Sequence, residues 1–508
     1  MHIGVLFFTL SGYTVQGGAL MEANFAADVV IIGAGVVGCA AARYLSRYKL
    51  DVVVLEKGAD VAVGATKANS GILHSGYDCH PGTLKAALNI EGLAMYPQLA
   101  RDLDIPYRIN GSLVVCFDDN EAKSLEELME RGRQNGVTDL ELLTGKEVLG
   151  IEPNLSPSIT GALRAKNAGI VSPYEAAVAF AENAARNGVT FRLNTRVTNI
   201  SVTKSAGGKS SYADTMYTVE TTNGNFRGAT VINAAGINSA AIHNMVCPDV
   251  ETISPQRGEY YLLDNNQREL VSHTIFQMPT ILGKGVLVTP TIEGNILLGP
   301  TAEKINDADD TSTTINGLHS ILGKVGLSLQ KNPIRDRITA FAGVRAKHES
   351  KDFILREAES GFFDAIGIDS PGLTAAPAIA KLLAEMVLAR IQPTVNRDFD
   401  PCRAGIKRFR DLSRKAQQDY IRTNPSYGRI VCRCETITEP EILESIQRPV
   451  GAGNLDAIKR RTRAQMGRCQ GGFCTIRLME LLSTELGVPE TEITKDGPGS
   501  ELVYNSYA

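Results

Sequence analysis

Four cysteines near the end of the chain are arranged in a way that suits metal chemistry. Cys432-Arg-Cys434 is followed, further along the chain, by Cys469-Gln-Gly-Gly-Phe-Cys474. Two thiolates on one loop and two on another can converge on one centre, and the glycines leave backbone amides free to point at sulfur. Four soft ligands suit zinc or an iron–sulfur cluster, and the spacing alone does not decide between them.

A second feature near the start of the chain predicts a dinucleotide site. Residues 28–32 form an apolar run typical of a buried parallel strand, residues 33–38 read Gly-Ala-Gly-Val-Val-Gly, and residues 39–48 have helical composition. In such a strand, turn and helix, the phosphates of the ligand lie at the N-terminus of the helix.

Each glycine of this turn has a physical task. Gly33 permits the tight turn, Gly35 lets a pyrophosphate approach the backbone, and Gly38 lets the helix pack close to the sheet. A second apolar strand, residues 52–55, ends in Glu56, which follows Gly38 at the spacing typical of an acid that accepts hydrogen bonds from a ribose. The ligand could be NAD or FAD. The segment Gly451-Ala-Gly453 does not make a second fingerprint, because it follows no strand and lacks a third glycine.

Over residues 26–395 the sequence resembles the flavoprotein family that includes glycerol-3-phosphate dehydrogenases, L-2-hydroxyglutarate oxidases and D-amino-acid oxidase. Residues 64–77 resemble the loop under the flavin, residues 230–236 the second cofactor strand and turn, and residues 341–345 and 365–374 the segments that close over the flavin. This resemblance favours FAD. The residues it implies for the cofactor are Gly33, Gly35, Gly38, Glu56, Asn69, Ser70, Gly71, Val197, Ala235, Gly236, Gly343, Gly372, Leu373 and Thr374.

The resemblance also implies how the fold is organised. We expect an α/β protein in which a Rossmann-like FAD-binding domain is interleaved with an antiparallel substrate domain and followed by a small α-rich C-terminal iron–sulfur domain. Alternating patterns, such as Gly258-Glu-Tyr-Tyr-Leu-Leu263, predict antiparallel strands with one solvated face. The expected boundaries are 26–100, 160–240 and 340–395 for the FAD-binding segments, 100–160 and 240–340 for the substrate segments, 396–428 for a linker, 429–495 for the [2Fe–2S] domain and 496–508 for a tail.

Candidate substrate residues follow from the same family. Arg345 corresponds to an arginine that faces the substrate anion, and a guanidinium can pair bidentately with phosphate or carboxylate. Lys351 lies where glycerol-3-phosphate dehydrogenases tend to have arginine, which weakens the phosphate assignment. Arg257 resembles a residue of the hydroxyacid branch. Oxidation of an alcohol needs a base, for which the candidates are His74, His348 and Tyr260.

The C-terminal cysteines resemble those of bacterioferritin-associated ferredoxin and of the version of that domain fused to anaerobic glycerol-3-phosphate dehydrogenases. The resemblance implies a [2Fe–2S] cluster on Cys432, Cys434, Cys469 and Cys474, with zinc as the alternative. The other cysteines (Cys39, Cys79, Cys116, Cys247 and Cys402) show no paired spacing. A one-electron centre on the same chain would give a reduced flavin an outlet to a partner protein or quinone.

Composition limits the other possibilities. The chain has 508 residues, 52 basic and 56 acidic, and no basic block that would indicate nucleic-acid binding. Nine cysteines are too few for a disulfide framework, which favours a reducing, cytoplasmic location, with any membrane contact made through a partner. Residues 3–10 are too short an apolar run for a membrane span, so we expect residues 1–25 to be a disordered or non-native extension.

We therefore predict an FAD-dependent dehydrogenase that oxidises sn-glycerol 3-phosphate to dihydroxyacetone phosphate by hydride transfer to flavin N5. The alternative is oxidation of an L-2-hydroxy acid such as 2-hydroxyglutarate, favoured by residues 69–76 and by the run Arg257-Gly-Glu-Tyr260. A third possibility, of another class, is a non-catalytic electron carrier or iron-handling subunit.

Overall fold

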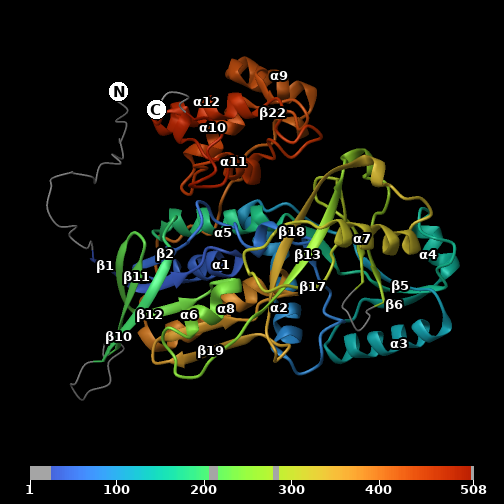
Figure 1. Cartoon of the computed structure of the whole chain (residues 1–508), viewed down its shortest axis with the longest axis horizontal. Coiled ribbons are helices and arrows are strands. Elements are labelled where there is room, and N and C mark those ends of the chain that lie inside the picture. Colours follow the sequence, from blue (N-terminus) through green and yellow to red (C-terminus); the bar gives the residue numbers. More distant parts are fainter. Residues whose placement is uncertain (1–23, 205–214, 279–284, 505–508) are drawn as a thin grey trace.

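The computed structural model describes residues 24–204, 215–278 and 285–504. The predicted N-terminal extension therefore lies mostly outside the described residues. Its last two residues, Asn24 and Phe25, already belong to the first strand, where they pair with Asn225 and Phe226. The arrangement of the elements is shown in Figure 1.

An eight-stranded sheet carries the glycine-rich turn. Its strands run in the order β10-β11-β12-β1-β2-β9, and β20 pairs with β12 on one side and β19 on the other. The central strand β1 is parallel to β2 and β12, so their carboxyl ends meet at one edge. The strands are β1 Asn24–Ile32, β2 Val52–Leu55, β9 Thr190–Arg192, β10 Val197–Lys204, β11 Thr215–Thr221, β12 Gly224–Asn233, β19 Ile354–Glu359 and β20 Phe362–Ile366.

Long helices cover this sheet, and their apolar side chains pack with those of the strands to form a hydrophobic core. Helix α1 packs against α5 and α8, and α8 packs against α2. The predicted helix at residues 39–48 begins earlier and ends earlier, because the chain enters it directly from Gly35. The helices are α1 Val36–Leu45, α2 Leu84–Leu103, α5 Pro173–Arg186, α6 Ser239–His243 and α8 Gly372–Ile391.

Within the described ranges, α8 is the one helix long and apolar enough to cross a membrane, with a mean hydropathy of 1.5 in its most apolar window. Of that window, 61% is buried inside the protein. Its side chains pack against α1 and α2, as expected of a core helix.

A second sheet of nine strands forms the part expected to hold the substrate, called the substrate half below. The order is β17-β13-β16-β15-β14-β5-β7-β6, and β18 pairs with β13 along its length. The expected antiparallel arrangement is confirmed for most neighbours, while β14 and β5 are parallel. The strands are β5 Ser112–Cys116, β6 Leu140–Thr144, β7 Gly161–Ala165, β13 Ser254–Leu263, β14 Thr274–Gln277, β15 Leu287–Pro290, β16 Ile296–Gly299, β17 Glu303–Lys304 and β18 Arg337–Lys347.

The prediction of one solvated face for residues 258–263 is wrong. All of these residues except Leu262 are buried, because β13 lies between β18 and β16 and one of its faces is turned toward helix α7. The helices of this half are α3 Asp119–Gln134, α4 Gly145–Ile151 and α7 Ile315–Ser328, and a small sheet joins β3 Ile72–Leu73, β8 Gly169–Val171 and β4 Tyr107–Ile109.

The C-terminal part folds around its own apolar cluster. Its elements are α9 Arg414–Thr423, β21 Ile430–Cys432, β22 Ile437–Thr438, α10 Glu439–Gln447, α11 Leu455–Thr462 and α12 Thr475–Leu486. A capping box begins α10, with the Thr438 amide donating to Glu441 Oε2 at 2.8 Å. In Figure 1 these elements lie together on one side of the molecule, with α11 facing α5.

The segment expected to be a linker is tied to the cofactor half. Arg403 Nε donates to Glu182 Oε2 at 2.7 Å, and Asn183 Nδ2 donates to the carbonyl of Asp400 at 3.0 Å. Helix α9 within this segment begins at Arg414, where the Ser413 hydroxyl caps it by accepting from the Ala416 amide.

Candidate active site and metal centre

The glycine-rich turn closes tightly at two of its three glycines. A Cβ atom on Gly33 would lie 2.5 Å from the carbonyl oxygen of Ala234, and one on Gly38 would lie 2.0 Å from the carbonyl oxygen of Gly33. A Cβ atom on Gly35 would meet nothing closer than Thr66 Oγ1 at 3.4 Å. Gly33 and Gly38 are therefore required by the protein's own packing, whereas the backbone at Gly35 is open toward the cavity described below.

Glu56 ties this turn to the loop after β2. Its two carboxylate oxygens accept from the amides of Ala34 at 2.8 Å and Gly58 at 2.7 Å. Burial raises the pKa of Glu56, while the two amides lower it. The carboxylate lies at the end of the strand next to β1, where a ribose hydroxyl would meet it.

One cavity of about 990 Å³ runs from this turn to strand β18. Its size and mixed lining suit a cofactor together with a small substrate. Among the residues predicted from the sequence, the cavity is lined by Gly33, Gly35, Glu56, Asn69, Ser70, His74, Val197, Ala235, Gly236, Tyr260, Gly343, Arg345, Gly372 and Leu373.

His74 is held by its backbone and its ring. Its amide donates to Thr374 Oγ1 at 2.9 Å, and its carbonyl accepts from Asn89 Nδ2 at 2.9 Å. The ring Nε2 lies 3.3 Å from Ser370 Oγ, and the ring centroid lies 5.9 Å from that of Phe276. The imidazole therefore enters the cavity in a fixed orientation.

Arg345 and Tyr260 come from neighbouring strands. Arg345 on β18 pairs in register with Gln256 on β13, and its Nη1 donates to the carbonyl of Thr301 at 3.2 Å and to Gln256 Oε1 at 3.3 Å. The Tyr260 ring stacks on Phe341 at a centroid distance of 4.9 Å, and its hydroxyl lies 3.4 Å from Ser70 Oγ. The Arg345 contacts in the described part of the chain include no carboxylate, so its charge is available to an anion.

Three other predicted substrate or base residues lie outside the lining of this cavity. Arg257 donates to Asp310 Oδ2 at 2.6 Å and to Glu303 Oε2 at 2.7 Å. His348 Nε2 lies 2.8 Å from Glu251 Oε2, and Lys351 is exposed on a turn. The structure therefore brings His74, Tyr260 and Arg345 together and leaves Arg257, His348 and Lys351 apart from them.

Three predicted cofactor residues also lie behind the lining, where they support it. Gly38 packs on Gly33, and Gly71, at a φ of +67°, packs on the carbonyl of Val171. Thr374 holds His74 through the hydrogen bond described above.

The four C-terminal cysteines lie together, in two pairs. Cys432 lies beside Cys474, and Cys434 lies beside Cys469. The thiol of Cys474 and the backbone amides of Gln465 and Glu435 lower the pKa of Cys432 to about 6, against the effect of burial. Burial raises the pKa of Cys469, but Cys434 and the amides of Gly471, Gly472 and Phe473 outweigh it, so that the pKa lies below its ordinary value. Thiolates that receive several amide hydrogen bonds are the donor set that an iron–sulfur cluster requires.

Comparison with known proteins agrees with both sites. Residues 28–386 match the family model described as FAD dependent oxidoreductase, and residues 430–484 match the BFD-like [2Fe-2S] binding domain. The chain belongs to the FAD-dependent oxidoreductase family.

Three relatives of this oxidoreductase are informative. It is 46% identical to a glycerol 3-phosphate dehydrogenase of Caloramator mitchellensis over 94% of its own length and 98% of that protein. It is 33% identical to the human mitochondrial L-2-hydroxyglutarate dehydrogenase over 56% of its own length and 63% of that protein. A solved structure of the L-alpha-glycerophosphate oxidase of Mycoplasma pneumoniae with FAD bound superposes with a TM-score of 0.69 at 32% identity, covering 74% of this chain and 98% of that one.

The oxidoreductase binds FAD and a [2Fe–2S] cluster, and its residues fit both groups. The opening at Gly35 leaves room for a pyrophosphate, and the Glu56 carboxylate stands beside it. At the cysteines, a Cβ atom on Gly467 would lie 2.4 Å from Cys434 Cβ, so only glycine lets the two cysteine loops come this close.

The polar residues of the cavity that sequence reasoning missed include Lys347, Ser320 and Lys324. Lys347 is the next residue but one after Arg345 on β18, and alternate residues of a strand share a face, so the strand period could have found it. Ser320 and Lys324 lie on α7, and no local pattern shows which neighbour a helix faces.

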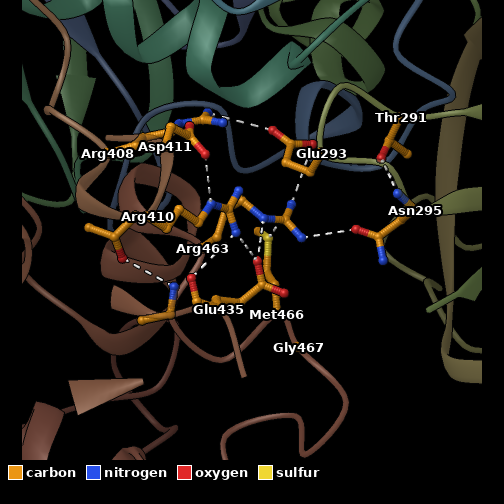
Figure 2. A network of polar contacts seen from close by, with 12 residues as sticks. Thr291, Glu293, Asn295, Arg408, Arg410, Asp411, Glu435, Arg463, Met466 and Gly467 are labelled. Carbon is orange, nitrogen blue, oxygen red and sulfur yellow. Dashed lines mark hydrogen bonds and ion pairs between the residues drawn. The ribbon is translucent and has the colours of Figure 1, made fainter. Parts of the chain in front are cut away.

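A buried network of charges joins the cysteine module to the substrate half (Figure 2). Arg463 Nε pairs with Glu435 Oε2 at 2.9 Å, its Nη2 donates to Asn295 Oδ1 at 3.0 Å, and its Nη1 lies 3.4 Å from Glu293 Oε2. Arg410 Nη1 also pairs with Glu435 Oε2, at 2.7 Å. Because Glu435 follows Cys434 directly, this network fixes one cysteine loop against the substrate half.

A second cluster of charges joins the module to the cofactor half. Asp60, in the loop after β2, is 1% exposed and accepts hydrogen bonds from Arg460 Nη2 and from both terminal nitrogens of Arg461, each at 2.8 Å. Burial raises the pKa of Asp60, but the charges of Arg461 and Arg460 outweigh it, so that the pKa lies below its ordinary value. The module is thus held by ion pairs to both halves of the oxidoreductase.

Proposed function

We propose that this oxidoreductase oxidises sn-glycerol 3-phosphate to dihydroxyacetone phosphate. The observation that carries the proposal is that His74 and Arg345 line one cavity with the glycine-rich turn. The dehydrogenase of Caloramator mitchellensis, similar over nearly the whole of both chains, supports the choice of substrate.

The residues of the cavity divide the work as follows. The guanidinium of Arg345 binds the phosphate through charge-assisted hydrogen bonds, and Lys347 adds a second positive charge. His74 Nε2 accepts the proton of the substrate hydroxyl as general base, and that hydroxyl takes the place of Ser370 Oγ, which lies 3.3 Å from Nε2 before substrate binds. Tyr260, stacked on Phe341, limits the space beside the substrate. FAD, when bound, accepts the hydride that leaves the same carbon.

An L-2-hydroxy acid is the second candidate. It is favoured by the similarity to the human L-2-hydroxyglutarate dehydrogenase. Against it, Arg257, the residue that suggested this branch, is already paired with Asp310 and Glu303. We propose that Arg257 fixes the turn between β17 and α7 and leaves Arg345 and Lys347 to bind a phosphate.

Anaerobic mixing of the FAD-loaded protein with each substrate separates the candidates. We expect sn-glycerol 3-phosphate to bleach the flavin absorbance and L-2-hydroxyglutarate to leave it unchanged. Lys351→Ala is the matched control for Lys347→Ala, because Lys351 lies on the same segment but outside the cavity. Only Lys347→Ala should weaken the binding of sn-glycerol 3-phosphate. Bleaching by L-2-hydroxyglutarate alone would reverse the assignment.

We further propose that electrons leave through the cluster held by Cys432, Cys434, Cys469 and Cys474 to an electron acceptor. Cys469→Ser should remove the cluster's electron paramagnetic resonance signal and stop turnover with that acceptor. Reduction of the flavin by substrate should persist, because it involves only the cavity. If the variant retains full turnover, the cluster is structural.

A further inference from the structure

The outer face of the cysteine module is apolar at its centre. Phe473, between two of the cysteine ligands in the chain, is 83% exposed, and Ile476 is 72% exposed. Beside them lies a hollow of about 470 Å³ whose lining includes Phe473, Ile430 and Val431. Large apolar side chains this exposed, on the loops that hold a redox centre, are typical anchors of an interface.

The rim of this hollow is positively charged. Its charged lining residues are Arg429, Arg433 and Arg477 with Glu439, which gives a net charge of +2 on a chain whose total is −4. Glu439 pairs with Arg429 and Arg477, Arg477 also pairs with Glu480 just outside the lining, and the side chain of Arg429 remains 66% exposed. Arg433 is exposed and makes no ion pair with any residue that the structure describes. We call Arg429, Ile430, Arg433, Phe473, Ile476 and Arg477 the outer face.

The opposite side of the cysteine loops is covered. Glu435 and Arg463 are buried there against Glu293 and Asn295 of the substrate half, as Figure 2 shows. Arg468, in the loop before Cys469, pairs with Asp264 at the end of β13. Of the cysteines themselves, Cys434 is exposed and Cys469 is partly exposed. A cluster at these cysteines would thus face the oxidoreductase on one side and solvent on the other.

We propose that the outer face docks an electron-accepting protein whose own surface is acidic around its redox centre. This inference rests on the proposed transfer of electrons through the cluster held by the cysteines, and it states the kind of protein that accepts those electrons. An apolar centre of a few side chains within a charged rim fits a small, transient interface of the kind electron-transfer partners use. Complementary charge speeds the encounter and leaves it sensitive to salt.

The electron count fixes the stoichiometry. Oxidation of the substrate alcohol to a ketone breaks its C–H and O–H bonds and releases two electrons and two protons. A haem acceptor takes one electron as its iron passes from the ferric to the ferrous state. Two acceptor molecules are therefore consumed for each substrate oxidised, and they dock in turn.

The test compares two haem proteins of opposite charge as probes, the acidic cytochrome b5 and the basic cytochrome c. Binding is measured by surface plasmon resonance with the holoenzyme, and haem reduction is measured separately with sn-glycerol 3-phosphate as donor. We expect cytochrome b5 to bind and to be reduced faster, with both effects weakening as salt rises above about 0.1 M, where the Debye length falls below about 10 Å.

Two variants locate the binding. Arg433→Glu should weaken binding of cytochrome b5 about tenfold and reduce its salt dependence, and Phe473→Ala should weaken it about tenfold with the salt dependence retained. The matched controls are Arg397→Glu and Val250→Ala, which change an exposed arginine and an exposed apolar residue outside the module and should alter nothing. The cluster signal confirms that each variant is folded.

Three results would overturn the proposal: equal binding of both cytochromes, unchanged binding by both outer-face variants, or reduction of a soluble quinone in place of cytochrome b5. The relay itself is tested by Cys469→Ser. If that variant still reduces cytochrome b5, the relay fails even where binding depends on Arg433. If Cys469→Ser stops reduction but Arg433→Glu and Phe473→Ala bind normally, the relay stands and the outer face is not the dock.

Discussion

Replacing Asp60 with asparagine should loosen the cysteine module from the cofactor half. The Asp60 carboxylate is 1% exposed and neutralises Arg460 and Arg461, whose side chains are 4% and 1% exposed. Asparagine keeps the shape of the side chain but removes its charge. Arg461 would then be buried without a carboxylate in ion-pairing distance, and Arg460 would retain only Asp496, whose Oδ1 lies 3.6 Å from its Nη1.

The free-energy cost of Asp60→Asn follows from the burial of the ion pair. Removing one partner of a buried ion pair costs about 3–5 kcal/mol, because it leaves an uncompensated charge in a medium of low polarity. The same change in an exposed pair costs about 0.5 kcal/mol or less. Lys57 and Asp309 form such a pair at 3.2 Å, with side chains 36% and 73% exposed, so Asp309→Asn is the matched control.

Hydrogen exchange measured by mass spectrometry can follow the module directly. A loss of about 3–5 kcal/mol should lower the protection of the amides in α11 by roughly two to four orders of magnitude, since each 1.36 kcal/mol is tenfold. Asp309→Asn should leave this protection within about threefold of the parent. The triple change Asp60→Leu, Arg460→Met and Arg461→Met should restore much of it, because no charge is then left buried.

Unchanged protection of α11 in Asp60→Asn would refute this reasoning. So would a triple variant less protected than the single one, because the loss would then come from packing and not from unpaired charge.

Three further predictions concern the same residues and the cavity. Acid should weaken the docking of the cysteine module on the cofactor half. The pKa of Asp60 lies below its ordinary value of 3.8, so the stabilisation from its charge is complete above pH 3.8 and is lost as the pH falls through the lower folded-state pKa. Hydrogen exchange of α11 measured against pH should show this loss in the parent protein and not in Asp60→Asn. Gly35→Val should abolish FAD binding, seen as loss of flavin absorbance after reconstitution, because the side chain would take the place of the pyrophosphate; full FAD content would contradict it. Arg345→Ala should raise the KM for sn-glycerol 3-phosphate about ten- to hundredfold with FAD content unchanged, because a hydrogen bond to a charged group contributes about 1.5–3 kcal/mol; unchanged steady-state constants would remove Arg345 from the site.

The parts of the fold that follow from the sequence are local. The strand, glycine turn, second strand and Glu56 all lie between positions 28 and 56, and the capping box lies between Thr438 and Glu441, so short-range spacing defines both. The two cysteine pairs could also be predicted to bind a metal centre from the sequence, because thiolates at this spacing are typical of such sites. Lys347 was within reach by the same kind of reasoning, through the two-residue period of β18.

The remaining features depend on contacts between distant segments. Arg257 looked like a substrate residue because its neighbours matched a family pattern, yet Glu303 and Asp310 occupy its guanidinium from a segment much further along the chain. Asp60 and Arg460 are separated by 400 residues, and nothing at either position shows that the other is its partner. Residues 258–263 alternate as a strand with one solvated face would, but five of the six are buried in a strand that lies between β16 and β18 and contacts α7.

The separation of Asp60 from its arginines also bears on how the protein is made. A ribosome adds about 5–20 residues each second, so the 400 residues between Asp60 and Arg460 take about 20–80 s to synthesise. Throughout that time the loop after β2 lacks its arginine partners, and the glycine turn, already translated, has no module over its neighbouring loop. The lining of the flavin cavity ends at Leu373, which is translated before Arg460, so we expect the flavin site to mature first and the cysteine module to dock last.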